Sequence, residues 1–180
     1  MVKLTPKQTK LLKSIHVLSA GIWITTGLVM LSFESFIPEK IQTGEHLYVA
    51  NYILFFIDTK ILPPAAITCL LTGLIYFVFT KWFFFKHNWL IFKWIVTVFL
   101  ILLGTFASEP LIIKMLALSK TKGIEALNNS NYEVISNGQF ILGLVLLSTL
   151  VVTVFISVFK PWKKEEASLN IPASLSIFPL

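Results

Sequence analysis

The chain has 180 residues, of which 56% are hydrophobic, and a formal net charge of +6. A soluble domain of this length would contain far fewer unbroken apolar runs, so the composition indicates an integral membrane protein. The basic excess comes entirely from lysines near the ends of apolar runs. No soluble domain presents them to nucleic acid, so we interpret them as topology determinants. The single cysteine, Cys69, excludes an intramolecular disulfide and a cysteine-based metal cluster.

The first apolar run, residues 14–36, is long enough to cross a bilayer as a helix, which takes about 20 residues. It is too long for a signal peptide and lacks a small-residue cleavage site, so we expect a retained span. Ionisable residues inside a span are functional candidates by default, which makes His16 the first candidate. One helical face carries His16, Ala20, Trp23, Gly27, Met30 and Glu34.

Three further spans are predicted, at about residues 61–80, 89–108 and 139–160. Residues 48–56 are expected to form an interfacial or early helical segment, and Pro63-Pro64 to open or kink the second span. Glu109-Pro110 should break or bend the third span, and the polar residues 120–138 should form the longest loop. The fold prediction is an all-α bundle of four transmembrane helices, a single domain over residues 1–162, with a flexible cytoplasmic tail at 163–180.

Four spans bring both termini to one side of the membrane. Nine lysines lie near that side and five near the other, so the positive-inside rule predicts that both termini are cytoplasmic. The nine are Lys3, Lys7, Lys10, Lys13, Lys81, Lys86, Lys160, Lys163 and Lys164, and the five are Lys40, Lys60, Lys114, Lys120 and Lys122. We expect a multi-pass protein of the cell membrane, and small residues on the helix faces favour a homodimer.

His16 and Lys93 are expected at similar depths in the cytoplasmic half of the membrane. Lys93 lies four residues into the third span, roughly 6 Å below its start at a helical rise of 1.5 Å per residue. An imidazole and an ammonium there could hold a porphyrin, because the nitrogen can bind iron and the cation can pair with a propionate. The alternatives are a histidine that only forms interfacial hydrogen bonds and a lysine that extends to the surface.

The other polar residues near the spans are weaker candidates. His87, in the predicted cytoplasmic turn, is the more plausible second iron ligand, although a solvated loop histidine is the commoner case. His46 lies on the opposite side. On that side Asp58 and Lys60 flank the entry to the second span and could form an ion pair with helix ends, but interfacial charges are the favoured interpretation. This group comprises Glu34, Asp58, Lys60 and Glu109.

Three segments resemble the HemJ-type protoporphyrinogen oxidases and the CopD-like copper-resistance membrane proteins. KSIHVLSAGIW carries a Lys-x-x-His motif followed by a tryptophan, Lys13, His16 and Trp23. PPAAITCLLTGLIYF matches the second helix of that group, with Pro64 and Gly73 in place. WLIFKWIVTVFLILLGTF matches the third, with Trp89, Leu90 and Lys93. The closing VFKPW is similar to that of a related family of uncharacterised four-helix bacterial membrane proteins.

This resemblance implies that His16 is a haem b ligand and that Lys93 is required for activity, and only these two residues inherit roles from it. We place Trp23, which follows His16 in the same motif, in the cofactor-binding set with His16, Lys93 and His87. The leading hypothesis is therefore a haem-binding membrane protein, with oxidoreductase activity on a tetrapyrrole or a lipid-soluble electron carrier. Two alternatives stay open. One is a CopD-like metal transport or assembly protein without haem, and the other is a structural membrane subunit without a cofactor. Residues 31–40 contain no histidine, so the resemblance does not supply a second iron ligand.

Overall fold

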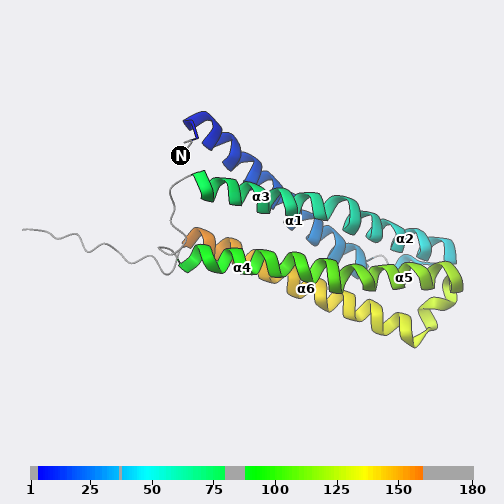
Figure 1. Ribbon diagram of the computed structural model, residues 1–180. Helices are drawn as coiled ribbons and strands as arrows, with labels where there is room; N and C mark the ends of the chain where they lie inside the picture. The colour runs from blue at the N-terminus through cyan, green and yellow to red at the C-terminus, as the bar shows by residue number, and fades with distance from the viewer. Residues whose placement is uncertain (1–3, 37, 80–87, 160–180) are drawn as a thin grey trace, which may run out of the picture.

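A computed structural model describes residues 4–36, 38–79 and 88–159. Over these residues the chain forms four long helical rods, each long and apolar enough to cross a membrane. The first rod is α1 (Pro6–Phe36) and the last is α6 (Ser130–Phe159). Figure 1 shows that the start of α1 and the end of α6 lie at the same end of the bundle. The all-α four-helix membrane fold is confirmed.

The second rod is one continuous helix, Gly44–Phe79. It comprises α2 (Gly44–Phe56), a π-helical segment η2 (Ile57–Ile61) and α3 (Leu62–Phe79). The side chain of Thr43 accepts a hydrogen bond from the His46 N–H at 3.2 Å and caps its start. The helix therefore begins about 17 residues before the predicted span, and residues 48–56 are fully helical. Pro63-Pro64 does not open the helix, because the wider π turn directly before it accommodates the missing N–H groups.

The third rod repeats this construction. It comprises α4 (Asn88–Leu103), a π-helical segment η4 (Gly104–Ser108) and α5 (Glu109–Lys122), followed by a 3₁₀ segment η5 (Gly123–Asn128). Pro110 falls in the first turn of α5, where its missing N–H costs little. Glu109-Pro110 therefore does not end the helix. The apolar stretch that follows extends the third rod instead of lying on the surface.

The prediction of a long polar loop at residues 120–138 is wrong. Only η5 and one residue separate α5 from α6. A buried cluster of Leu47, Met115, Ala126 and Tyr132 holds this region, and Tyr132 exchanges hydrogen bonds with Asn51 at 3.0 and 3.2 Å. Here α2 and α5 lie side by side, at the end of the bundle opposite the N-terminus (Figure 1).

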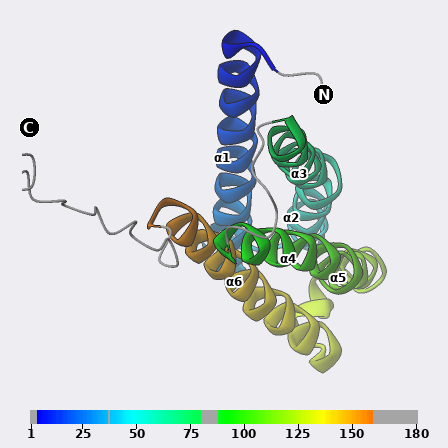
Figure 2. The same ribbon diagram turned by 60° about the vertical axis from the view of Figure 1, so that its left-hand side comes forward.

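The packed interior is narrow and the outer surface is apolar. A central core layer consists of Trp23, Ala65, Ala66, Cys69, Leu100 and Leu150. Large apolar side chains face outward on every rod, which is the pattern expected where lipid replaces water as the surrounding medium. Examples are Val17, Leu18, Leu71, Phe99, Phe106, Phe155 and Val158. The N-terminal turns of α1 project beyond the other helices (Figure 2).

Candidate functional site

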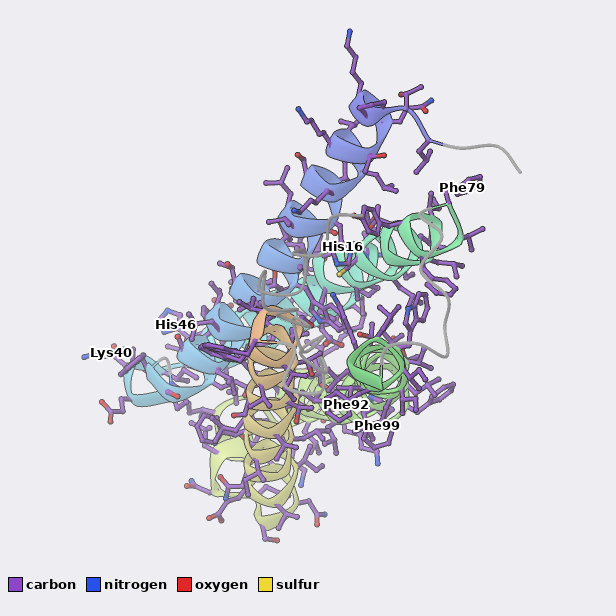
Figure 3. The ribbon with its side chains drawn as sticks, turned by 90° about the vertical axis from the view of Figure 1, so that its left-hand side faces the viewer. His16, Lys40, His46, Phe79, Phe92 and Phe99 are labelled. Atoms are coloured by element: carbon purple, nitrogen blue, oxygen red, sulfur yellow. The ribbon has the colours of Figure 1, made fainter. Side chains whose placement is uncertain are left out.

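His16 lies on α1 and points toward α3, as Figure 3 shows. Its Nδ1 atom is 3.0 Å from the carbonyl oxygen of Cys69 and 3.0 Å from the hydroxyl oxygen of Thr72. Gly73 leaves room for the ring, because a Cβ atom there would be 3.4 Å from His16 Cε1. Packing against the backbone of α3 therefore holds the imidazole in one orientation.

The contact with Cys69 defines the tautomer of His16. A carbonyl oxygen can only accept a hydrogen bond, so Nδ1 must carry the proton that it donates to Cys69. The lone pair of a neutral imidazole is then on Nε2. This arrangement, in which one ring nitrogen donates to the backbone and the other stays basic, is how metal-binding histidines are usually oriented.

Lys93, on α4, reaches the other side of the same ring. Its Nζ atom is 3.4 Å from His16 Nε2, where the ammonium group can donate a long hydrogen bond. Both side chains are half-buried. The structure thus brings together the two residues that the sequence placed at a similar depth. Their expected roles, as iron ligand and propionate partner, stay predictions.

His16 and Lys93 line a cavity of about 460 Å³, which we call the His16 cavity. It lies between α1, α3, α4 and α6, at the end of the bundle where α1 begins and α6 ends. Its walls are mainly apolar and aromatic, and Lys13 adds a second cationic group. The lining residues are Lys13, His16, Val17, Cys69, Leu70, Gly73, Tyr76, Phe77, Leu90, Lys93, Trp94, Thr97, Ser157 and Val158.

Of the other predicted cofactor residues, Trp23 does not line this cavity. Trp23 belongs to the central core layer. Its side chain lines a second cavity, on the other side of this layer from His16. His87 lies outside the described residues. His46 is exposed in the first turn of α2 and belongs to the opposite half of the molecule, as predicted.

A second cavity, of about 70 Å³, lies on the other side of the core layer, and we call it the Glu34 cavity. Its polar lining consists of Glu34 from α1, Asp58 from η2, Ser108 from η4 and Gln139 from α6. Ser108 Oγ is 2.9 Å from Gln139 Nε2, which donates a hydrogen bond to it. The four helical rods therefore converge on this small polar chamber.

The prediction that Asp58 is an interfacial charge at the entry to the second span is wrong. The side chain of Asp58 is only 7% exposed, whereas that of Lys60 faces outward. Because the second rod begins at Gly44, Asp58 lies in its middle instead of at the start of a span. A signal was present in the sequence, since the buried residues Leu47, Asn51 and Leu54 precede Asp58 at spacings of three and four, which define one helical face.

Comparison with known proteins identifies the family of the chain. No curated protein and no solved structure matches it significantly. A family model described as a predicted integral membrane protein, DUF2269, matches residues 10–161. This range includes both cavities and all four helical rods apart from the first turn of α1. The chain therefore belongs to the DUF2269 family of predicted integral membrane proteins.

Proposed function

We propose that this protein binds haem b in the cell membrane and that the His16 cavity holds the macrocycle. The observation that carries the proposal is the orientation of His16. Its Nδ1 atom is engaged by the Cys69 carbonyl, which leaves Nε2 as the basic nitrogen on the cavity side. A protein can bind haem iron through such a nitrogen without rearranging its backbone.

The size and lining of the cavity also support a flat, largely apolar ligand. Its volume of about 460 Å³ falls within the range of about 300–1,000 Å³ that is typical of sites for cofactors and small molecules. Tyr76, Phe77 and Trp94 contribute aromatic surface to its walls. Apolar walls with few, fixed polar groups would orient a macrocycle and exclude water from its face.

The two lysines at the cavity fit the acidic edge of a haem. Lys93 Nζ lies 3.4 Å from Nε2, and Lys13 is exposed at the cavity lining one turn before His16. With Nε2 bound to iron, the Lys93 ammonium would lose its hydrogen-bond acceptor and could pair with a propionate. Lys13 could pair with the other propionate. These roles give His16, Lys93 and Lys13 each a partner on the haem, the iron for the imidazole and a propionate for each ammonium group.

Bound haem would supply one-electron transfer. The resemblance of Lys13, His16 and Lys93 to motifs of the HemJ-type oxidases supports an oxidoreductase that acts on a tetrapyrrole or a lipid-soluble electron carrier, with Lys93 required for activity. The proposed unit is a homodimer, which light scattering of the purified protein would test.

The test is haem binding by the purified protein. Wild-type protein titrated with haemin should develop a Soret band at one haem per chain, and His16→Ala should lose or strongly shift that band. Lys93→Ala should keep the ligation but retain haem less well. His46→Ala is the matched control, because this histidine is exposed and lies outside the cavity.

A wild-type protein that stays colourless with ample haem would contradict the proposal. Binding of copper ions by the same preparation would then favour the CopD-like alternative. Among the described residues, no group of three or more His, Cys, Asp or Glu side chains is arranged to hold a metal ion. A haem spectrum unchanged in His16→Ala would also overturn the assignment of His16.

A further inference from the structure

The Glu34 cavity contains an unusual arrangement of acidic groups. The side chain of Asp58 is 93% buried, since only 7% of it is exposed, and the structure gives it no hydrogen bond among the described residues. The Oε1 atom of Glu34 is also buried without a hydrogen-bond partner. The two carboxyl groups come from different helices and interact electrostatically. Two negative charges at this depth would repel each other and lack solvation.

No basic side chain offsets these charges in the described part of the chain. The nearby titratable groups are Glu109, which interacts electrostatically with Asp58, and Tyr132, which interacts with Glu34. The nearby lysines, Lys60 and Lys114, face outward. Gln139 lies within hydrogen-bonding reach of the Glu34 carboxyl group but carries no charge. A positive charge that balances ionised carboxyl groups here would therefore come from a bound ion or a proton.

The two π-helical segments border this cavity, and η2 contributes Asp58 and η4 contributes Ser108 to its lining. In η2 and η4 the backbone hydrogen bonds are shifted, so that Leu62 N–H donates to Ile57 O and Glu109 N–H donates to Gly104 O. Single π turns inside α-helices occur frequently at functional sites.

We propose that the Glu34 cavity binds one monovalent cation, a proton or Na⁺, between the carboxyl groups of Glu34 and Asp58. The volume of about 70 Å³ holds a small ion with a few waters, because one water needs about 10–15 Å³. A divalent ion is disfavoured because Ca²⁺ takes about 6–8 oxygen ligands and Mg²⁺ requires octahedral coordination, whereas only Glu34, Asp58, Ser108 and Gln139 contribute polar side chains to the lining. This proposal does not depend on haem binding, and it concerns the opposite side of the core layer.

Two measurements on the purified protein, without added haem, test the site and identify the cation. The first compares thermal unfolding at alkaline pH in NaCl and in choline chloride of equal ionic strength. Bound Na⁺ should raise the midpoint specifically, by roughly 2–8 °C. The second records infrared spectra across a pH titration. A bound proton should appear as the carbonyl stretch of a protonated carboxyl group that persists at neutral pH.

The variants Asp58→Asn and Glu34→Gln should each abolish whichever signal the wild type shows. Glu133→Gln is the matched control, because Glu133 is exposed on α6 and should leave the signal unchanged. Two results would overturn the proposal. One is a wild type with neither signal, and the other is a signal that persists in a folded carboxyl variant. Because the two variants are independent, one that fails to fold leaves the other to decide.

Discussion

The His16 cavity and the Glu34 cavity lie in opposite halves of one bundle and have no lining residue in common. The first is large, aromatic and supplied with basic nitrogen atoms, whereas the second is small and supplied with carboxyl oxygen atoms. A large chamber with cations suits a flat molecule with acidic groups, and a small chamber with carboxylates suits a cation. The comparison shows that the ionisable side chains lining the two cavities have opposite character, basic in the His16 cavity and acidic in the Glu34 cavity.

The core layer separates the two sites. Cys69 belongs to this layer and lines the His16 cavity, while Trp23, Leu100 and Leu150 belong to it and line the Glu34 cavity. Close-packed side chains leave little room for water between the chambers. We therefore expect substitutions in one cavity to leave ligand binding in the other unchanged, and their effects to be additive.

The largest effect is expected from filling the His16 cavity at Gly73. A Cβ atom added at this position would lie 3.4 Å from His16 Cε1, so the longer side chain of Gly73→Leu should displace the imidazole. Haem affinity should fall by about 100-fold, the upper range for loss of ligand support. Titration with haemin measures it. Gly21→Leu is the control, because nothing lies within 4 Å of a Cβ atom there. Equal affinity in the two variants would contradict the proposed cavity.

A smaller effect in the same cavity is expected from Thr72→Val. The substitution keeps the shape of the side chain but removes the hydroxyl oxygen 3.0 Å from His16 Nδ1, while the Cys69 carbonyl remains. Haem affinity should fall by about 10-fold, with a change in reduction potential measured by spectroelectrochemistry. Thr149→Val removes a hydroxyl that bonds only to its own helix, at Val145 O, and should leave both quantities unchanged. A loss of cation binding in Thr72→Val would show that the cavities are coupled.

In the Glu34 cavity, Ser108→Ala should reduce stability without affecting haem. It leaves the Gln139 amide without its partner at 2.9 Å, and polar side-chain pairs in membrane proteins contribute about 0.6–1.7 kcal/mol. The thermal midpoint should fall by roughly 1–6 °C. Ser32→Ala removes an exposed hydroxyl bonded to Leu28 O in the same helix and should have a smaller effect. A drop in haem affinity in Ser108→Ala would contradict the separation of the two sites.

The smallest perturbation is a reporter fusion, which measures the membrane topology. The topology shows which cavity lies nearer the cytoplasm. The lysine distribution predicts that a fusion at Lys164 reports the cytoplasm and that one at Asn128 reports the outside. The His16 cavity would then lie in the cytoplasmic half and the Glu34 cavity in the outer half. The reverse pattern would exchange these assignments while leaving the geometry of both sites unchanged.

The sequence by itself determined the four spans and the first candidate site. Long apolar runs are a local property, since transfer of each residue into lipid contributes nearly independently of the others. Helical rise then gave the relative depths of His16 and Lys93, and the structure places their nitrogen atoms 3.4 Å apart. These predictions succeeded because they needed only composition, the helical repeat and the order of the spans.

The tertiary structure alone decided which polar residues are buried and how far each helix extends. Asp58 is a buried group only because α1 packs against η2 and side chains of α1, η4 and α6 line the cavity beside it, and no local pattern states which helices meet there. Trp23 was expected beside the cofactor, but the rotation of α1 places it in the core layer. The sequence predicted a break or bend at each proline, because the hydrogen bond that a proline cannot donate is a property of its own helix. The π turns and the interhelical packing that keep the rods continuous depend on the whole bundle.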